Sequence, residues 1–278
     1  MNKESHTALN DIPTILVVGG SDSSGGAGIQ ADCAVARFHH IMPICAISCI
    51  TSQGISGLKM ISPADEAIFA SQLDVAFDEM KPAGVKIGMI PAERLINILI
   101  DKLEYYRPSN VVLDPVMGAT SGRKDVCNEM WRNPDIFSRI SPYLNLITPN
   151  IPEALSMADL DWHIAGQDDA MRLAAEIKGK YQFKNVLLKG GHLESPTLSD
   201  CLLDEDNRFF HYSHPAIITR NNHGTGCALS TAIVCNLISG KQIPEACDQS
   251  IHTLGEKLNQ NSDLVFFSDS SAKGPAFF

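Results

Sequence analysis

The hydrophobic positions of the chain form short apolar runs that alternate with segments of helical spacing. Runs rich in Val, Ile and Leu predict strands, and apolar residues that recur every three or four positions predict helices. The predicted strands cover residues 14–19, 43–50, 84–88, 110–114, 144–148, 185–189, 200–204 and 208–212. The predicted helices cover residues 27–40, 63–80, 91–106, 126–139, 151–158, 167–181, 226–239 and 243–259.

This alternation predicts an α/β fold with a central, mostly parallel sheet and helices on both faces. The last two predicted strands lie close together in the sequence and are expected to form a small hairpin at the edge. Right-handed crossovers would bring the carboxyl ends of all strands to one edge, so that the loops there share one cleft. Ser62-Pro63-Ala64-Asp65 is expected to start the helix over 63–80, with a cap, a first-turn proline and an early acid.

No repeat or interdomain linker interrupts the pattern, so residues 1–278 are expected to form one domain. The polar residues 1–12 and the tail 268–278 are expected to be loose.

A glycine- and serine-rich loop follows the first predicted strand. Ile15 to Val18 is β-branched and apolar, residues 19–28 read Gly-Gly-Ser-Asp-Ser-Ser-Gly-Gly-Ala-Gly, and helical spacing follows. Loops at strand carboxyl ends are where open α/β sheets bind ligands. Gly26-x-Gly28-x-x-Ala31 loosely matches a dinucleotide fingerprint, but it begins too far from the strand. No carboxylate for a ribose follows near residues 51–53, so a Rossmann protein is disfavoured.

A second glycine turn lies at residues 222–230, Asn-His-Gly-Thr-Gly-Cys-Ala-Leu-Ser. Its glycines let the backbone approach a ligand, and the free N–H groups of the following helix would favour an anion. The helix dipole is also expected to lower the pKa of Cys227 below its usual value of about 8.5. A tightly packed loop-to-helix junction remains an alternative. A Cys-His hydrolase using His223 is disfavoured because no third orienting group is evident.

Charged residues follow several of the other predicted strands. Asp114 and Glu153 suit a hydrated Mg²⁺ ion, which takes few direct carboxylates, and Lys189 suits a phosphate. Each of these residues alone could be an exposed polar residue at a strand end. Together with the glycine turns, they supply what phosphoryl transfer requires, because positioning and charge neutralisation carry most of that catalysis.

Composition excludes several other classes of protein. A net charge of −10 without any basic run argues against nucleic-acid binding. No apolar stretch reaches the roughly 18 residues of a membrane span, and residues 1–11 lack the apolar core of a secretory signal, so we expect a cytoplasmic protein.

The eight cysteines include no Cys-x-x-Cys pair and are expected to be mostly free thiols. His211 and His214 would point to opposite faces of a strand, which disfavours zinc binding.

Several of these motifs, in this order, resemble those of the hydroxymethylpyrimidine/phosphomethylpyrimidine kinases of thiamine biosynthesis, in the ribokinase superfamily. The resemblance runs from about residue 14 to the end of the chain. Gly224-Thr225-Gly226-Cys227 is its sharpest element, because most ribokinase relatives carry Asp where this family carries Cys. The other motifs are residues 19–32, Val85-Lys86-Ile87-Gly88-Met89, Asp114-Pro115-Val116-Met117, residues 147–154 and Leu188-Lys189-Gly190-Gly191-His192.

The resemblance implies a ribokinase-like fold, ATP and Mg²⁺ as cofactors, and a homodimer. It implies that Cys227 takes the proton of a hydroxymethyl group while the amides of Gly224, Thr225 and Gly226 hold the γ-phosphate. The pyrimidine would lie against Gly20, Asp32, Gln53 and Met89. Asp114 and Glu153 would organise the metal, and Lys189 and Asn150 would contact the nucleotide.

Two alternatives remain within this resemblance. A pyridoxal or pyridoxamine kinase would phosphorylate a similar heteroaromatic alcohol, and a vitamin-binding protein could keep the site without catalysis. The chain also departs from the family where Gly54-Ile55 replaces a common Asn-Thr and Gly118-Ala119-Thr120 replaces a common Val-Ala-Lys. Both departures lie where substrate or nucleotide contacts are expected.

Overall fold

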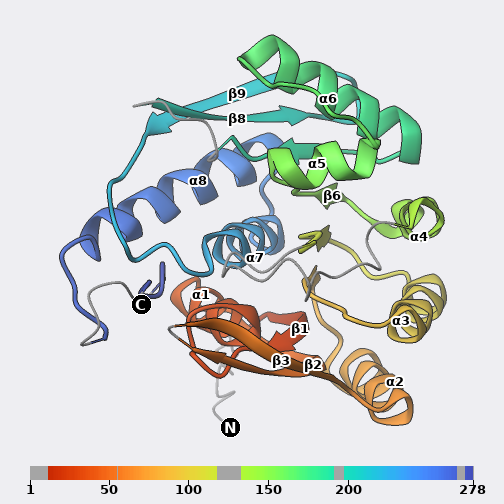
Figure 1. Ribbon diagram of the computed structural model, residues 1–278. Coiled ribbons are helices and arrows are strands. Elements are labelled where there is room, and N and C mark those ends of the chain that lie inside the picture. Colours follow the sequence, from red (N-terminus) through yellow and green to blue (C-terminus); the bar gives the residue numbers. More distant parts are fainter. Residues whose placement is uncertain (1–11, 55, 118–132, 191–196, 268–272, 278) are drawn as a thin grey trace, which may run out of the picture.

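The computed structural model describes residues 12–54, 56–117, 133–190, 197–267 and 273–277. Within these residues nine strands form one sheet in the order β3-β2-β1-β4-β5-β6-β7-β8-β9 (Figure 1). The strands are β1 (Thr14–Ser21), β2 (Met42–Gly54), β3 (Gly57–Pro63), β4 (Gly84–Ile87), β5 (Val111–Leu113), β6 (Leu146–Ile147), β7 (Val186–Leu188), β8 (Thr197–Leu203) and β9 (Phe209–Pro215).

The six strands from β2 to β7 in this order are parallel, and antiparallel pairs form both edges. The predicted fold class, a mostly parallel sheet with a hairpin at its edge, is confirmed. The prediction that every strand ends at the same edge is wrong for β3 and β8, because both run antiparallel to their inner neighbours.

Helices cover both faces of the sheet. They are α1 (Gly28–Phe38), α2 (Glu66–Val75), α3 (Glu93–Tyr106), α4 (Pro134–Ile140), α5 (Ile151–Ala158), α6 (Gln167–Tyr181), α7 (Thr225–Ile238) and α8 (Ile243–Gln260), with a π turn at Ala76–Met80 and a 3₁₀ turn at Ser141–Tyr143.

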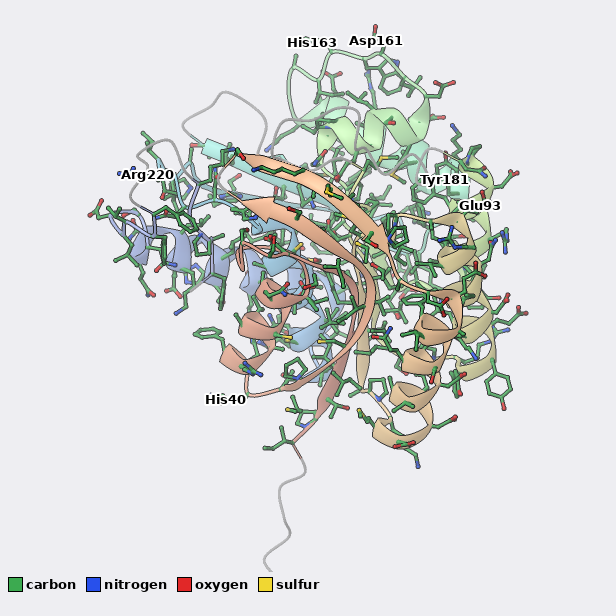
Figure 2. All side chains as sticks on the ribbon, turned by 60° about the horizontal axis from the view of Figure 1, so that its bottom comes forward. His40, Glu93, Asp161, His163, Tyr181 and Arg220 are labelled. Atoms are coloured by element: carbon green, nitrogen blue, oxygen red, sulfur yellow. The ribbon has the colours of Figure 1, made fainter. Side chains whose placement is uncertain are left out.

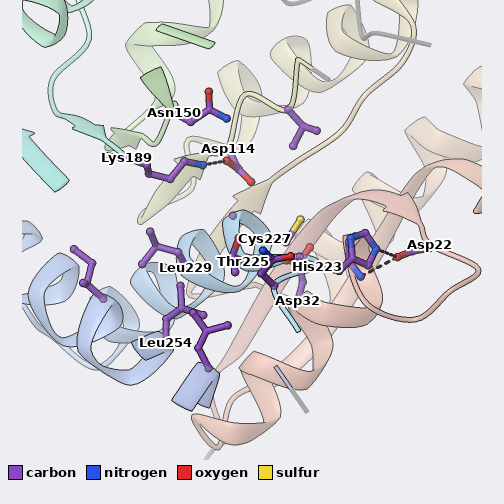
Figure 3. A pocket seen from close by; sticks show the side chains of 18 of the residues that line it. Asp22, Asp32, Asp114, Asn150, Lys189, His223, Thr225, Cys227, Leu229 and Leu254 are labelled. Atoms are coloured by element: carbon purple, nitrogen blue, oxygen red, sulfur yellow. Dashed lines mark hydrogen bonds and ion pairs between the residues drawn. The ribbon is translucent and has the colours of Figure 1, made fainter. Parts of the chain in front are cut away.

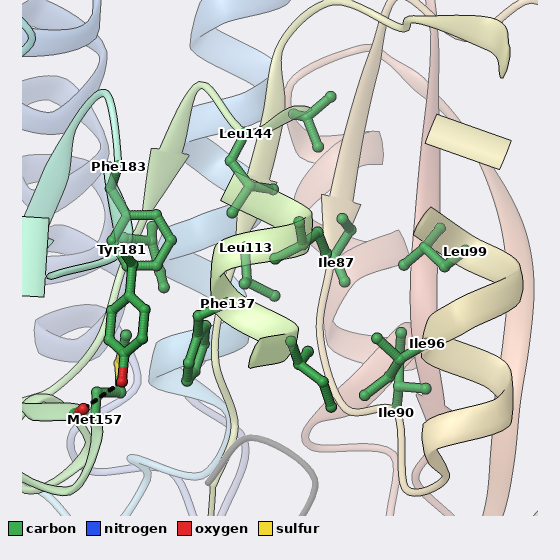
Figure 4. Packing of buried hydrophobic residues seen from close by; sticks show 14 of the residues in the cluster. Ile87, Ile90, Ile96, Leu99, Leu113, Phe137, Leu144, Met157, Tyr181 and Phe183 are labelled. Atoms are coloured by element: carbon green, nitrogen blue, oxygen red, sulfur yellow. Dashed lines mark hydrogen bonds between the residues drawn. The ribbon is translucent and has the colours of Figure 1, made fainter. Parts of the chain in front are cut away.

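The alternation of side chains along β1 shows how the two layers form. Ile15 and Val17 belong to a core that includes apolar residues of α1, α7 and α8. Leu16 and Val18 point the other way, into the larger core with α2 to α6, part of which is drawn in Figure 4. Successive strand residues face opposite sides, so a continuously apolar strand is buried on both faces.

Strand β3 was not predicted. It pairs antiparallel with β2 and begins at Gly57, which has φ +95°, and the two strands run side by side as a curved ribbon (Figure 2). Because β3 lies at the sheet edge, Lys59, Met60 and Ser62 are exposed and its pattern is not that of a buried strand.

The predicted start of the next helix is also wrong. Pro63 ends β3 instead of occupying the first turn, a position where an edge strand tolerates proline. Asp65 is the N-cap, and its Oδ1 accepts hydrogen bonds from the N–H groups of Ala67 and Ile68. The helical segment therefore begins at Glu66 and ends in the π turn at Met80.

The end of the chain does not follow the expectation of a loose tail where it is described. Ala276 is fully buried, and the Phe277 ring meets the Phe38 ring edge-on at 5.3 Å. His223 donates its N–H to Gly274 O, and Ala276 donates its N–H to His223 O. Residues 273–277 therefore pack against the second glycine turn. Residues 1–11 and 268–272, and residues 126–132 of the predicted helix over 126–139, lie outside the described residues.

The described cysteines and histidines have these surroundings in the structure. Seven cysteines are free thiols, among them Cys33 and Cys45, whose Sγ atoms lie 3.4 Å apart. His214 Nε2 lies 3.3 Å from Asp200 Oδ2. No group of three or more His, Cys, Asp or Glu residues in the described ranges could hold a metal ion. None of the described helices combines the length and apolar character needed to cross a membrane.

Candidate active site

A cavity of about 380 Å³ opens at the carboxyl ends of the parallel strands (Figure 3). Its wall combines residues that follow β1, β4, β5 and β7 with the first turns of α1 and α7. Every site residue predicted from sequence lines it: Gly20, Asp32, Gln53, Met89, Asp114, Asn150, Glu153, Lys189, Gly224, Thr225, Gly226 and Cys227. The topology thus brings residues from the whole chain into one site.

Asp22 organises the first glycine loop. Its Oδ1 accepts the N–H of Ser24 at 2.8 Å, and its Oδ2 accepts the N–H of Ala27 at 2.9 Å. Burial opposes ionisation of this carboxyl, but hydrogen bonds from His223 and Ser24 prevail and lower its pKa to about 2. Asp22 is therefore ionised and holds the loop in one shape.

Close backbone contact accounts for the glycines of both turns. Gly224 has φ +81°, and a Cβ atom there would lie 2.1 Å from Gly26 O. A Cβ atom on Gly28, where φ is +58°, would lie 2.3 Å from Gly20 O. Only glycine permits such approach and such dihedral angles without strain. The two turns therefore pack together and place the starts of α1 and α7 side by side.

The first turn of α7 presents donors to the cavity. The first hydrogen bond of this helix runs from Ala228 N to Gly224 O, so the N–H groups of residues 225–227 have no acceptor within the helix. A Cβ atom on Gly226 would lie 3.3 Å from both Asp114 Oδ2 and Lys189 Nζ. These amides face the charged wall opposite and are suited to an anion such as a phosphate.

Cys227 is half-buried in the same turn. Burial raises the pKa of its thiol to about 11, although the charge of Lys86 and the N–H of Gly28 act in the opposite direction. The prediction of a lowered pKa is therefore wrong for the ligand-free protein. The helix dipole favours a thiolate and lowers the pKa, but removal of the sulfur from water raises the pKa by more.

Lys86 and Asp32 form a buried ion pair in this wall. Lys86 Nζ donates to Asp32 Oδ2 at 2.9 Å, and the two side chains are 1% and 0% exposed. Thr231 Oγ1 donates to Asp32 Oδ1 at 2.7 Å. Burial raises the pKa of Asp32, and Lys86 counters that effect. Asp32, expected to contact the pyrimidine, thus has both oxygens engaged within the protein.

Asp114 and Lys189 form a second ion pair on the opposite wall. Lys189 Nζ lies 2.8 Å from Asp114 Oδ1, and Figure 3 shows the pair facing the start of α7. Burial would lower the pKa of Lys189, but Asp114 and Glu153 hold it above its ordinary value. Lys189 therefore keeps its positive charge inside the cavity.

Asn150 and Glu153 begin helix α5 through a capping box. Asn150 Oδ1 accepts the N–H of Glu153, and Glu153 Oε2 accepts the N–H of Asn150, both at 2.8 Å. Burial is the main reason that the pKa of Glu153 rises to about 7. The charge of Lys189 lowers this pKa, and the charge of Asp114 raises it. The Glu153 carboxylate also accepts a backbone hydrogen bond from Met117, and its charge interacts with that of Asp114. The two carboxylates fit Mg²⁺, which would take its other ligands from water and a bound nucleotide.

The remaining predicted substrate residues form the other side of the cavity. Gly20 has no room for a side chain, because a Cβ atom would lie 2.8 Å from Cys49 Sγ. Met89 Sδ contacts the same sulfur at 3.9 Å. Gln53 Nε2 lies 3.2 Å from His223 Nε2, and its side-chain oxygen makes no hydrogen bond within the described residues. This side could accept a flat ring that needs both a donor and an acceptor.

Sequence reasoning gave no kinase role to His223, Asp22 or Lys86. His223 Nε2 lies 2.9 Å from Asp22 Oδ2, so the orienting group that the sequence left unidentified is supplied by the first loop. No hydrogen bond joins His223 to Cys227 among the described residues, which gives the hydrolase alternative no support. The signal for Lys86 was present as a charged residue inside the apolar run Val85-Lys86-Ile87.

The far end of the cavity is apolar. It is lined by Leu198, Ile217, Leu229, Ile251, Leu254 and Leu258, from β8, the segment after β9, α7 and α8. A flat apolar group such as a nucleobase would fit between these side chains, with the charged walls next to it.

Residues 22–265 match the profile of the phosphomethylpyrimidine kinase family. The chain is 35% identical over 233 residues to the thiamine biosynthesis bifunctional protein ThiED of Geobacter sulfurreducens, which covers 84% of the chain and 46% of that protein. The chain thus spans about half the length of the first curated relatives it matches.

Two solved structures resemble the fold. The phosphomethylpyrimidine kinase of Clostridium difficile 630 is 34% identical with a TM-score of 0.73, covering 88% of this chain and 99% of that one. An ADP complex of Bacillus subtilis pyridoxal kinase is 26% identical with a TM-score of 0.79, covering 90% and 93%.

Proposed function

Because the chain belongs to the phosphomethylpyrimidine kinase family, we propose that it is an ATP-dependent kinase of thiamine biosynthesis. It phosphorylates 4-amino-5-hydroxymethyl-2-methylpyrimidine, and then the monophosphate to the diphosphate. The observation that carries this proposal is the cavity itself, where the Cys227 thiol and the first-turn amides of α7 face the Asp114–Lys189 pair. The proposal also draws on the relatives, which are named as enzymes of this pathway.

The nucleotide occupies the apolar end and the charged wall. The base lies among the leucine and isoleucine side chains of α7 and α8, and Lys189 contacts the phosphates, with Asn150 beside it. The similar pyridoxal kinase of Bacillus subtilis was solved as an ADP complex, which supports a nucleotide in such a fold. When bound, Mg²⁺ neutralises phosphate charge and is held by Asp114 and Glu153, directly or through water.

The pyrimidine lies on the other side of Cys227. Gly20 and Met89 contact the ring, and Gln53 can both donate to and accept from an aminopyrimidine edge. Asp32 lies in the wall of the cavity near the ring, with its carboxylate engaged by Lys86 and Thr231.

The transfer step needs one proton acceptor and a set of donors. The Cys227 thiolate takes the hydroxyl proton, the hydroxyl oxygen bonds to the γ-phosphorus, and the bond from that phosphorus to the bridging oxygen breaks, leaving ADP. The amides of Gly224, Thr225 and Gly226 stabilise the charge on the γ-phosphate oxygens. In the second reaction the monophosphate itself is the acceptor and needs no proton removal.

A coupled ADP-release assay tests the proposal. With ATP and Mg²⁺, we expect turnover with hydroxymethylpyrimidine and with its phosphate, and a higher kcat/KM for these than for pyridoxal and pyridoxamine. A higher value for pyridoxal would make the chain a vitamin B6 kinase instead. Tight pyrimidine binding without ATP consumption, in a folded sample, would support a vitamin-binding protein and overturn the proposal.

A further inference from the structure

Lys86 is a charged residue built into the centre of the sheet. It lies in β4 opposite Val17 of β1 and Val112 of β5, and both valines belong to the core beneath α1 and α7. Gly84, two residues earlier on the same face, packs so closely on α7 that a Cβ atom would lie 2.7 Å from Val234 Cγ1. The Lys86 side chain therefore extends between β4 and the first turns of the two helices.

The Lys86 ammonium has more donors than acceptors among the described residues. An ammonium carries three N–H donors, and within the described ranges Lys86 Nζ makes one hydrogen bond, to Asp32 Oδ2. The side chain lines the cavity although it is 1% exposed. Asp32 balances the charge of this buried cation, and the remaining donors are available to stabilise a second anion that forms at the floor of the cavity.

Cys227 is the group that can become that anion. Thr231, which binds the other oxygen of Asp32, lies one turn after Cys227 in α7, so the network places Lys86 beneath this turn. The charged groups that act on Cys227 are Lys86 from β4, Asp32 from α1, Asp114 after β5 and Lys189 after β7. Lys86 is the cation whose effect on the thiol is strongest.

We propose that Lys86 is a positioning residue for the proton transfer: its buried ammonium, fixed by Asp32, stabilises the Cys227 thiolate that accepts the substrate proton. This inference rests on the proposed function for the identity of the alcohol. As the proton moves from the hydroxyl oxygen to Cys227 Sγ, negative charge leaves the sulfur and passes to the oxygen bonding phosphorus. Lys86 stays protonated and stabilises both positions of that charge without giving up a proton.

Opposite shifts in two variants test the electrostatic role. Lys86→Met removes the cation, so the pH at which Cys227 becomes reactive should rise. Asp32→Asn removes the anion that competes for Lys86, so this pH should fall. We expect a change of about one pH unit, or about tenfold in alkylation rate at pH 8, in each direction. The readout is iodoacetamide labelling of the Cys227 peptide, followed by mass spectrometry from pH 6 to pH 10. Lys184→Met, at an exposed lysine before β7, is the matched control and should leave the curve unchanged.

The outcomes separate a charge effect from a packing effect. Loss of packing alone would shift the labelling curves of both variants in the same direction or leave both curves unchanged. Either result overturns the inference. If Lys86→Met does not fold, Asp32→Asn must still move the labelling curve to lower pH, and an unmoved curve overturns the inference.

Kinetics give a second readout. We expect Lys86→Met to lower kcat on the order of a hundredfold at pH 7, with the KM for ATP changed less than threefold, and to move the pH–kcat profile upward. The labelling needs no turnover, so it remains decisive if the pyrimidine is not a substrate. Turnover of the pyrimidine without opposite labelling shifts would leave the proposed function intact and reject the role of Lys86.

Discussion

Asp22 Oδ2 and His223 Nε2 lie 2.9 Å apart, although 201 positions separate the two residues in the chain. The contact joins the first glycine loop to the turn that begins α7. The ring of His223 also fills the space above Gly26, where a Cβ atom would lie 2.5 Å from its Cδ2. The two loops that form the anion-binding part of the site are therefore one packed unit.

Asp22→Asn should uncouple these loops. The amide keeps one acceptor oxygen, so it cannot accept both the Ser24 N–H, which bonds to Oδ1, and the Ala27 N–H and His223, which bond to Oδ2. We therefore expect kcat/KM to fall about tenfold. The low pKa of Asp22, about 2 against an ordinary 3.8, means that its stabilising effect is present above about pH 4 and is lost as the pH falls towards 2. Between pH 7 and pH 3, the melting temperature of the variant should fall less than that of the wild-type protein. The exposed Asp101→Asn should behave like wild type.

Gly224→Ala should be strongly destabilising. The new Cβ would overlap Gly26 O, and φ +81° is unfavourable for alanine, so we expect a loss of about 3 kcal/mol in the free energy of unfolding. Gly179→Ala is the matched control, because it lies in α6 with open space around it and should stabilise by about 0.5–1 kcal/mol. Urea unfolding measures both. A Gly224→Ala protein as stable as wild type would contradict the packing of the two loops.

The fold was largely predictable because its signals are local. The run Ile15-Leu16-Val17-Val18 is apolar at every position, which indicates a strand covered on both faces, and the glycines at its end indicate the loop. The strand β3 escaped prediction because an edge strand buries few side chains, and Pro63 was more easily interpreted as a helix start. The capping role of Asn150 was visible in the sequence as Asn-x-x-Glu, but a predicted metal role for Glu153 obscured it.

The electrostatics of the site could not be predicted from sequence. The pKa of Cys227 depends on how completely the fold removes the sulfur from water, a property of the assembled wall and not of the turn. Asp22 and Lys86 acquire their partners from distant segments, and no local pattern specifies those contacts. The residues predicted from sequence all line one cavity, but the direction predicted for the pKa shift of the Cys227 thiol is wrong.

Cys227→Ser and Cys227→Ala should fold normally and lose kcat on the order of a hundredfold, because neither hydroxyl nor methyl replaces the thiolate as proton acceptor. Since burial raises the pKa of Cys227 to about 11, its alkylation at pH 7 without ligands should be about a hundred times slower than that of an exposed cysteine. Kinetics and peptide-resolved labelling measure the two effects. A Cys227→Ala variant that keeps a third of wild-type kcat would remove the thiol from the mechanism.

Asp114→Asn and Glu153→Gln should each raise the Mg²⁺ concentration needed for half-maximal rate by about tenfold, because each removes one charged oxygen ligand. Asp114→Asn should weaken nucleotide binding as well, but by less than Lys189→Met does, because Lys189→Met removes the phosphate contact itself. Activity is measured against free Mg²⁺, with EDTA as the zero point. Asp159→Asn, at the exposed end of α5, serves as control. Unchanged Mg²⁺ dependence in both variants would place the metal elsewhere.

Gly274→Ala should disturb catalysis from outside the cavity. Residues 273–277 bond to both backbone groups of His223, and a Cβ atom on Gly274 would lie 2.1 Å from Asn221 Oδ1 and 2.5 Å from a Phe266 ring carbon. Because Asn221 is itself buried, the new methyl group can be accommodated only if the tail or the turn moves. We expect kcat to fall at least about tenfold while the KM for the pyrimidine changes little, since the shift reaches the amides of α7 before the ring contacts. Lys273→Ala, exposed in the same tail, should keep full activity. Equal activity of the two variants would mean that the tail covers the turn without supporting it.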